Sequence, residues 1–354
     1  MVDFKFFKDK KIFLTGHTGF KGSWLSRILI SAGAKITGYS LTPPSTPNLF
    51  SLSGVENELK SIIGDIRDRG KLIKSFIEAK PEIVIHMAAQ PLVRESYLDP
   101  VYTYETNVIG TVNILECVRL YGQAVKSILN VTTDKVYLNN EWCWGYREVD
   151  SLDGFDPYSN SKSCSELVTN SYKNSFFVCT KEEVAISSVR AGNVIGGGDF
   201  AKDRIIPDCV RAASNRETII VRNSNSTRPY QHVLEPLFAY LMIIKRQYED
   251  INYADCYNVG PDDSDCITTG QLVESFCKLW GDGQDWKSLS KGSPHEANFL
   301  KLDCAKIKSI FNWKPRWSYI QALEKTIEWT KAYNSDGDIS SIMDDQIEKF
   351  SFER

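Results

Sequence analysis

The sequence predicts an α/β protein with a doubly wound parallel sheet and a smaller C-terminal lid of mixed α/β structure. Short apolar runs alternate with helix-length segments through the first half of the chain. One run, over residues 81–89, is almost continuously apolar, as expected of a strand that is covered on both faces. A glycine-rich turn joins the first apolar run to the first helical segment. Strands joined by helical crossovers form parallel sheets, so these observations predict the fold class.

The individual elements follow from this alternation. We predict strands over residues 11–14, 34–41, 61–64, 81–89, 126–132 and 184–191. Helices are predicted between them, over 20–31, 67–79, 101–121 and 158–176. A proline-rich loop ends the second strand because proline continues neither a strand nor a helix. This order is that of a Rossmann-type sheet, in which ligands lie beyond the carboxyl ends of the strands.

The second half of the chain is less regular. After residue 191, loops rich in Gly, Arg, Asn and Pro are interrupted by predicted short helices over 235–246 and 271–279. We therefore predict a first domain over 1–191 with returning segments near 230–260. A discontinuous lid over 192–330 and a C-terminal tail over 331–354 complete the chain.

Bulk composition excludes several classes of protein. A net charge of −3 over 354 residues gives no general attraction to nucleic acid or to anionic membranes. Nine cysteines without a C-x-x-C pair and four scattered histidines indicate reduced thiols and no metal site. The chain shows no signal-peptide pattern and no apolar run long enough to span a bilayer. We expect a cytoplasmic protein.

The glycine-rich turn is a candidate phosphate-binding site. Gly16, Gly19 and Gly22 allow a tight turn, close approach of the backbone to a pyrophosphate, and close packing of helix on strand. The free N–H groups at the helix N-terminus then face the anion. Lys21 adds a point charge to the phosphates or is a solvated surface lysine. The candidate dinucleotide-binding residues of this turn are Gly16, His17, Thr18, Gly19, Phe20, Lys21 and Gly22.

Further candidates for the cofactor site follow later strands. Asp65 is placed to meet the adenine side of a dinucleotide, or it caps a turn. Ala88, Ala89 and Gln90 end the fourth strand, where small residues let a cofactor lie against the backbone. Asn107 lies within a predicted helix, where asparagine is a mediocre helix former. Residues 39–42 hold neither an acid nor an arginine to recognise the ribose, so the residues leave NAD and NADP open.

The candidate catalytic residues lie on a strand end and the following helix. Tyr158 and Lys162 are four residues apart, hence on one helix face. A nearby ammonium is expected to lower the pKa of the phenol. Thr133, Asp134 and Lys135 follow the preceding strand, and supply a hydroxyl, an acid and a base. An ordinary polar turn would also explain these three residues.

Several motifs carry a family resemblance. The G-x-x-G-x-x-G spacing resembles the extended short-chain dehydrogenase/reductase family. Segments 16–24, 141–148, 156–162 and 227–236 resemble the sugar nucleotide 4,6-dehydratases of the CDP-glucose type. Asp134 and Lys135 stand where dTDP- and GDP-sugar dehydratases have an Asp–Glu pair. The resemblance covers residues 8–330.

The resemblance implies an NAD-dependent lyase that acts on CDP-glucose in the synthesis of deoxysugar and O-antigen precursors. Tyr158 would take the proton of the C4 hydroxyl, with Thr133 holding the oxygen and Lys162 supporting the phenol and the nicotinamide ribose. The resulting ketone acidifies C5. Lys135 would then remove the C5 proton, while Asp134 protonates the departing C6 hydroxyl.

The resemblance also implies the substrate contacts and the assembly. Asn193 would meet the sugar nucleotide, and Arg228 the diphosphate, since a guanidinium matches paired oxygens. Arg204 is a second cation candidate, although an ion pair with Asp203 or Asp208 explains it as well. His232 lines the substrate site or is a structural histidine. A homodimer is expected through a bundle of the helices over 101–121 and 158–176.

Two other functions remain open on the residues alone. A sugar-nucleotide epimerase or reductase would keep Tyr158 and Lys162 without eliminating water, and Asp134 with Lys135 argues against it. A non-catalytic dinucleotide-sensing regulator is a remoter alternative. Such regulators typically lose the Tyr or the Lys, and this chain keeps both.

Overall fold

The computed structural model describes residues 2–178, 183–289 and 299–352. Seven strands form the main sheet: β1 (Lys11–Thr15), β2 (Lys35–Ser40), β3 (Lys60–Ile63), β4 (Ile83–His86), β5 (Ser127–Thr133), β6 (Ala185–Ala191) and β10 (Cys256–Val259). Their order is β10-β6-β5-β4-β1-β2-β3, and every neighbouring pair is parallel. The order reverses between β1 and β4, which is the switch point where ligands bind in doubly wound sheets. The predicted Rossmann-type fold is confirmed.

The α-helices are α1 (Phe20–Ser31), α2 (Leu49–Leu52), α3 (Arg69–Ala79), α4 (Val93–Leu98), α5 (Pro100–Tyr104), α6 (Gly110–Tyr121), α7 (Pro157–Tyr172), α8 (Ile205–Ser214), α9 (Leu234–Glu249), α10 (Thr269–Trp280), α11 (Ala305–Phe311), α12 (Tyr319–Asn334) and α13 (Ile339–Phe352). Short 3₁₀ turns lie at η1 (Phe4–Phe7), η2 (Val55–Asn57), η4 (Asp134–Val136), η6 (Ile251–Tyr253) and η7 (Asp263–Asp265). Two π-helical turns are η3 (Glu105–Ile109) and η5 (Lys173–Phe177). The expected helix over 101–121 is therefore interrupted by the π-helical turn η3.

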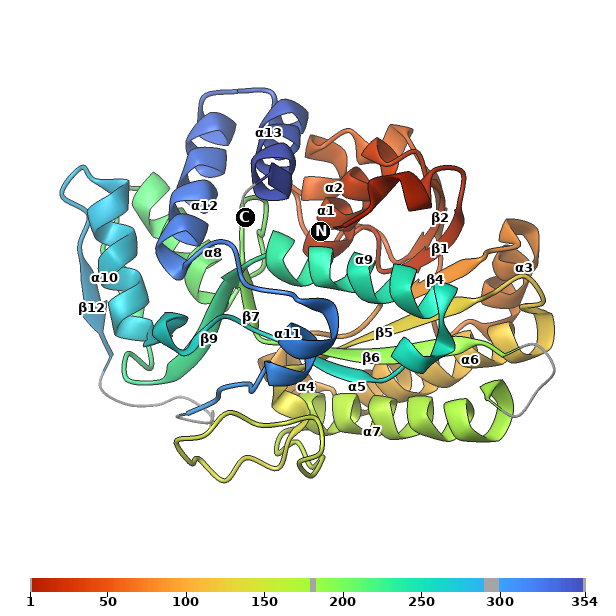
Figure 1. Cartoon of the computed structure of the whole chain (residues 1–354). Coiled ribbons are helices and arrows are strands. Elements are labelled where there is room, and N and C mark those ends of the chain that lie inside the picture. The colour runs from red at the N-terminus through yellow and green to blue at the C-terminus, as the bar shows by residue number, and fades with distance from the viewer. Residues whose placement is uncertain (1, 179–182, 290–298, 353–354) are drawn as a thin grey trace.

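Helices cover both faces of the main sheet (Figure 1). Successive side chains of β1 alternate between the two faces. Ile12 and Leu14 enter the larger core with α1 and α9, and Phe13 enters a second core with residues of α3 and α6. Because both faces are buried, β1 and β4 show the continuous apolar runs on which the sequence prediction rested.

The remaining strands form two small sheets on one side of the molecule. β7 (Asn193–Ile195), β9 (Thr227–His232) and β11 (Cys266–Thr268) make one, and β8 (Ile219–Val221) with β12 (Trp286–Ser288) makes the other. A third apolar core joins them to α8, α10 and α12. α9 and β10 return to the main sheet, in line with the expected returning segments near 230–260.

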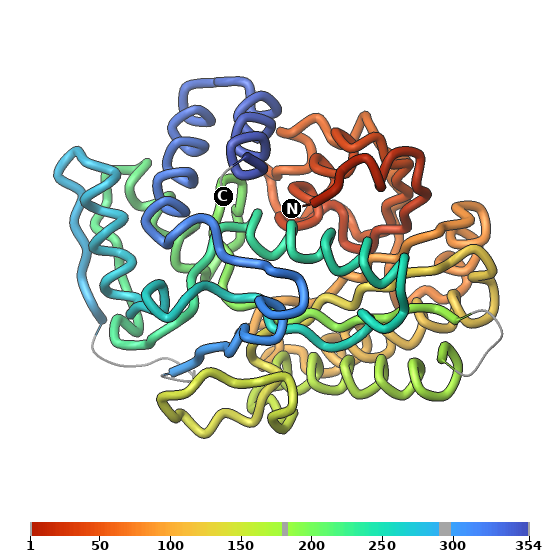
Figure 2. The backbone as a smooth tube through the Cα atoms, in the orientation of Figure 1, coloured from red at the N-terminus to blue at the C-terminus, as the bar shows by residue number. Residues whose placement is uncertain are grey.

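The segment expected as a tail is mostly helical. α13 packs against α1 and α12, near the N-terminal segment in the backbone view of Figure 2. The ring of Phe350 lies 4.7 Å from that of Phe238 and 4.9 Å from that of Trp317, measured between centroids. Arg27 of α1 donates to Asp344 of α13. These contacts make α13 part of the main core.

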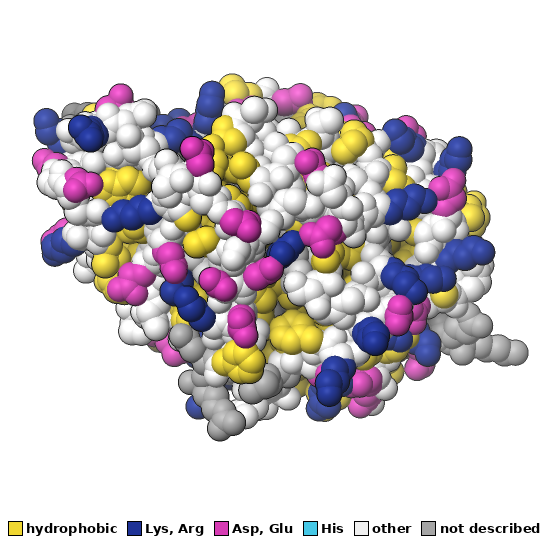
Figure 3. Space-filling view, turned by 90° about the horizontal axis from the view of Figure 1, so that it is seen from above, with side chains coloured by type: hydrophobic (Ala, Val, Ile, Leu, Met, Phe, Trp, Pro, Cys, Tyr) yellow, Lys and Arg dark blue, Asp and Glu magenta, His cyan; other side chains and the backbone are white. Residues whose placement is uncertain are grey.

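The surface carries a mixture of charges. On the face seen in Figure 3, lysine and arginine side chains are interspersed with aspartate and glutamate. Over the parts of the chain that the structure describes, no helix combines the length and the apolar character that crossing a bilayer requires. Within the same parts, no three potential metal ligands gather in one place.

Candidate active site

The glycine-rich turn packs against the end of β4. Gly16 has a φ of +79°, and a Cβ there would lie 2.9 Å from the backbone nitrogen of Ala88. A Cβ on Gly22 would lie 2.2 Å from the carbonyl oxygen of Gly16. Around Gly19, by contrast, the nearest atom to a Cβ is the same oxygen at 3.5 Å. Gly16 and Gly22 therefore close the turn against β4 and α1, whereas a Cβ on Gly19 would make only an ordinary van der Waals contact.

The start of α1 suits an anion. Gly19 is the N-cap residue, no side chain caps the helix, and its first turn holds no acidic residue. The first N–H groups of the helix therefore have no side-chain acceptor, while the helix dipole favours negative charge at this end. The space beside Gly19 and this uncapped turn fit the pyrophosphate of a dinucleotide.

Two other residues of the turn attach it to the rest of the sheet. His17 is buried, hydrogen-bonds to Ser61 at 2.7 Å through Nε2, and lies over Gly38, where a Cβ would be 2.4 Å from the ring. Thr18 donates to the carbonyl of Leu41 at 2.9 Å. These contacts give His17 and Thr18 a packing role, since they bind the turn to β2 and β3.

Asn107 joins the end of β4 to α7. Its Oδ1 accepts from the Gln90 backbone at 2.8 Å, and its Nδ2 donates to the Gln90 carbonyl at 3.1 Å and to Ser161 at 2.9 Å. Asn107 lies in the π-helical turn η3, a feature frequent at functional sites. Ala88 and Ala89 remain partly exposed beside it. Asn107 therefore positions the segment along which a cofactor could lie.

Asp65 occupies the turn-capping role that the sequence left open. Its Oδ1 accepts from the backbone N–H of Arg67 at 2.9 Å, and its carboxylate pairs with the Arg67 guanidinium at 2.8 Å. Arg67 also pairs with Glu105. The hydrogen bonds from Arg67 hold the pKa of Asp65 below its usual range.

Thr133 lies at the centre of the candidate catalytic residues. Its hydroxyl donates to Asp134 Oδ1 at 3.0 Å, and it also acts on Tyr158, whose pKa it lowers against the effect of burial. The other carboxylate oxygen of Asp134, Oδ2, has no hydrogen-bond partner among the described residues. Burial raises the pKa of Asp134. Burial thus favours the acid form of this carboxyl group, the form that a general acid requires.

Tyr158 and Lys162 do share a face of α7, but their electrostatics differ from the expectation. Burial raises the pKa of Tyr158 to about 12 and lowers that of Lys162 to about 8. Lys162 donates to the carbonyl of Val131 at 2.9 Å. The expected lowering of the phenol's pKa was thus wrong for the protein alone, because the loss of hydration outweighs the nearby positive charges.

α7 begins where its sequence dictates. Asp156 is the N-cap residue and accepts from the Ser159 N–H at 3.0 Å, while Pro157 takes the first helical position. Proline suits that position because its missing N–H would have no partner there. This start sets Tyr158 in the first turn of α7 and Lys162 one turn later.

Three cationic side chains gather around this group. Lys21 interacts electrostatically with Asp134, Lys162 and Arg204, and burial lowers its pKa to about 8. Arg228 on β9 is buried and interacts with Asp134. Arg204 pairs with Asp199 at 2.9 Å, and not with Asp203 or Asp208 as the sequence had suggested. Sequence reasoning had not anticipated that Lys21 interacts with Asp134, because the direction of a side chain in the first turn follows from the folded turn.

The two remaining substrate candidates differ in their surroundings. Asn193 begins β7 beside Tyr230 of β9 and is partly exposed. His232 is fully buried, with its ring centroid 4.8 Å from that of Trp317 and 6.0 Å from that of Trp24. The assignment of His232 to the substrate site was wrong on this geometry, because a ring enclosed between two indoles packs the core.

Comparisons with known proteins agree with this arrangement. A family model described as GDP-mannose 4,6 dehydratase matches residues 13–326. The chain is 50% identical over 337 residues to a CDP-glucose 4,6-dehydratase of Salmonella typhimurium, covering 94% of each chain. It is 27% identical to a probable dTDP-glucose 4,6-dehydratase of Sinorhizobium fredii, covering 90% of this chain and 92% of that one.

Solved structures share the fold. A dTDP-glucose 4,6-dehydratase from Bacillus anthracis in complex with NAD has a TM-score of 0.75 at 22% identity, with 93% of this chain and 98% of that chain covered. A UDP-glucose 4-epimerase from Thermotoga maritima has a TM-score of 0.78 at 21% identity, with 91% and 99% covered.

The parallel sheet, the glycine-rich turn at its switch point and the Tyr–Lys pair on α7 define a protein of the extended short-chain dehydrogenase/reductase class. Within that class, the chain belongs to the GDP-mannose 4,6 dehydratase family.

Proposed function

We propose that this chain is an NAD-dependent hydro-lyase that converts CDP-glucose to CDP-4-keto-6-deoxy-glucose. The observation that carries the proposal is the hydroxyl of Thr133, which donates to the carboxyl of Asp134 and also acts on the phenol of Tyr158, whose pKa it lowers. A 4-oxidation needs the phenol, whereas a dehydration also needs an acid within reach of the same sugar. The 50% identity to a CDP-glucose 4,6-dehydratase supports the reaction and the nucleotide.

The residues around the switch point fit NAD. The loosely packed turn at Gly19 and the uncapped start of α1 would hold the pyrophosphate. Ala88, Ala89 and Gln90 would lie along the cofactor, with Asn107 holding that segment in place. Asp65 and the turn that it caps would lie near the adenine. When bound, NAD⁺ would supply a hydride acceptor for C4 and later the hydride that reduces C6.

Tyr158 and Lys162 would carry out the proton transfer at the C4 hydroxyl. Tyr158 takes this proton as a phenolate, and Thr133 holds the C4 oxygen beside it. Burial raises the pKa of the phenol. Added positive charge near the phenol has the opposite effect, because it favours the phenolate. Lys162 is anchored on Val131 and would present its ammonium to the nicotinamide ribose.

Asp134 and Lys135 would eliminate water once C4 is a ketone. Lys135 would remove the acidified C5 proton. Burial raises the pKa of Asp134, which favours its acid form, and Asp134 would pass a proton from the unpartnered Oδ2 to the departing C6 hydroxyl. The reaction is redox-neutral overall, and water is the second product.

Three cations and an amide would bind the sugar nucleotide. Arg228 and Lys21 interact with Asp134, and Arg204 interacts with Lys21 and Tyr158, so a diphosphate near these residues would meet several positive charges. Asn193, at the start of β7, would contact the sugar nucleotide. The division of labour follows: residues 1–191 with the returning segments hold the cofactor, and 192–330 hold the substrate.

We also propose a homodimer and a cytoplasmic location. Apolar side chains on adjacent elements are exposed in the single chain: Leu98 (78%), Val101 (67%), Ile109 (50%) and Leu167 (57%), on α4, α5, η3 and α7. A second copy packed there would bury them in a helix bundle. The described cysteines are all unpaired, as expected in a reducing compartment.

Incubation with CDP-glucose and NAD⁺ tests the function, with formation of the 4-keto-6-deoxy sugar followed by its absorbance in base. We expect Tyr158→Phe to lower kcat by about 10²–10⁴-fold, the usual contribution of a general base. Side-by-side assays of CDP-, dTDP-, GDP- and UDP-glucose test the nucleotide. Recovery of an epimerised sugar that keeps its C6 hydroxyl would overturn the proposal in favour of an epimerase.

A further inference from the structure

The segment that carries the acid–base pair lies beyond the sheet. β5 pairs with β6 up to Thr133, which lies opposite Ala191. The next residues, Asp134–Val136, form the 3₁₀ turn η4 and have no partner in the ladder. The positions of Asp134 and Lys135 therefore depend on contacts from other elements, whereas Thr133 is held by the sheet itself.

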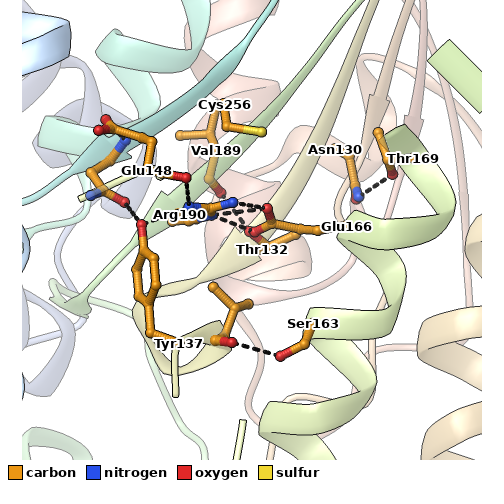
Figure 4. A network of polar contacts seen from close by, with 12 residues as sticks. Asn130, Thr132, Tyr137, Glu148, Ser163, Glu166, Thr169, Val189, Arg190 and Cys256 are labelled. Atoms are coloured by element: carbon orange, nitrogen blue, oxygen red, sulfur yellow. Dashed lines mark hydrogen bonds and ion pairs between the residues drawn. The ribbon is translucent and has the colours of Figure 1, made fainter. Parts of the chain in front are cut away.

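α7 supplies part of this support. Ser163 donates to the carbonyl of Val136 at 2.7 Å, directly after the acid–base pair. Thr132, directly before Thr133, donates to Glu166 at 2.6 Å. Figure 4 shows Ser163 and Glu166 on the helix that faces this segment. The segment is thus bonded to α7 on both sides.

A buried ion pair extends this support across the site. Arg190 of β6 donates through Nε to both carboxylate oxygens of Glu166 at 2.9 Å. Its Nη1 donates to the hydroxyl of Tyr137 at 2.7 Å and to the carbonyl of Glu148 at 3.2 Å. We call Glu166 and Arg190 the clamp (Figure 4), because together they contact residues 132 and 137 on either side of 133–136.

Burial of the two charges of the clamp costs free energy. Their contacts with each other are therefore not evidence that the clamp stabilises the fold. The side chains of Arg190 and Glu166 are 3% and 2% exposed, so both charges are almost wholly removed from water. Replacement of a buried ion pair by apolar residues of similar volume is often neutral or stabilising. A role in position, rather than in stability, accounts for keeping two charges at this place.

We propose that Glu166 and Arg190 are positioning residues that set Asp134 and Lys135 for the elimination across C5 and C6. This inference rests on the proposed dehydratase function. Oxidation at C4 depends on them less, because Thr133 is held by the β5–β6 ladder and Tyr158 by the capped start of α7. Glu166 acts on this step only through its charge, which raises the pKa of Lys162 against the effect of burial. Loss of the clamp would slow the elimination of water much more than the oxidation at C4.

The test is a single-turnover experiment on the double variant Glu166→Leu/Arg190→Met with CDP-glucose and NAD⁺. We expect NADH to form at a rate within about threefold of the wild type, while 4-keto-6-deoxy sugar forms about 10²-fold more slowly, the penalty of a misplacement near 1 Å. Enzyme-bound NADH then accumulates, and solvent deuterium enters C5 more slowly. The thermal midpoint should be equal to or above that of the wild type.

Ser187→Ala is the matched control. Ser187 is also buried on β6 and donates to Gln247, far from residues 133–136 in the bonding network. It should lower the thermal midpoint without changing the ratio of the two rates. Arg190→Lys serves if the double variant does not fold, since one ammonium cannot reach both Glu166 and Tyr137, and we expect the same separation of rates.

Equal slowing of NADH formation and product formation, or no slowing of either, would overturn the role of the clamp. The wild-type arm tests the proposed function separately. A wild type that forms neither NADH nor a 4-keto sugar from CDP-glucose contradicts the dehydratase itself, whatever the variants do.

Discussion

At the scale of single residues, the three glycines of the glycine-rich turn have three different surroundings. Gly16 combines a positive φ with close contact to β4, Gly22 touches the Gly16 carbonyl, and Gly19 has room for a Cβ at van der Waals distance. One added methyl group therefore has a different effect at each position. The difference separates a role in folding from a role in binding.

We expect Gly22→Ala to destabilise the fold by about 1–3 kcal/mol, because its Cβ would meet backbone that cannot move without shifting α1. Gly19→Ala should leave the free energy of unfolding nearly unchanged and weaken NAD binding by tenfold or more, about 1.4 kcal/mol. Urea denaturation and NAD titration measure the two effects. Equal loss of stability in both variants would contradict the assignment.

Single residues also mark the limit of sequence reasoning. The spacing of Tyr158 and Lys162 predicted a shared helix face because helical periodicity is local. By contrast, the pairing of Arg204 with Asp199 and the enclosure of His232 depend on chain segments that meet only in the fold. The prediction that the pKa of Tyr158 is lowered was wrong for the same reason, since burial is a property of the whole site.

At the scale of elements, α7 combines several tasks. It carries Tyr158 and Lys162, supports residues 132–136 through Ser163 and Glu166, and exposes Leu167 on its outer side. Helix boundaries followed closely from sequence, whereas the π-helical turn around Asn107 did not. That turn accompanies hydrogen bonds from Asn107 to Gln90 and Ser161, which no local pattern reveals.

Leu167→Glu tests the proposed dimer. A charge buried in an apolar bundle is costly, so we expect the variant to be monomeric in sedimentation or light scattering at concentrations where the wild type is dimeric. Val149→Glu is the control, because Val149 is 82% exposed on the loop between η4 and α7 and is not part of these helices. A Leu167→Glu protein that remains dimeric would exclude this face as the interface.

At the scale of the whole molecule, buried histidines connect stability with pH. Burial lowers the pKa of His17 to about 4 and those of His86 and His232 to about 3. These residues stay neutral in the folded state, while the unfolded chain takes up protons near pH 6.5. Their contribution is therefore complete above about pH 6.5 and is lost progressively as the pH falls toward the folded values.

His232→Phe should remove one of the groups that take up a proton on unfolding, while keeping the aromatic packing between Trp24 and Trp317. As the pH falls from 6.5 to 4, we expect the free energy of unfolding to decrease less steeply in the variant than in the wild type. The two slopes should differ by about 1.4 kcal/mol per pH unit. Urea denaturation at several pH values measures the difference. The comparison with wild type is required because Glu235, whose pKa burial raises to about 8, acts in the opposite direction.

The order of the main sheet has a consequence for synthesis on the ribosome. β6 ends at residue 191, yet its outer neighbour β10 begins only at residue 256, after β7, β8, β9 and α9 have been made. Until then the nascent chain presents β6 as an open edge, the kind of surface that invites mispairing. The nucleotide-binding sheet is complete only after residue 259 of 354 has emerged, so its late closure is a window in which a chaperone would have most to protect.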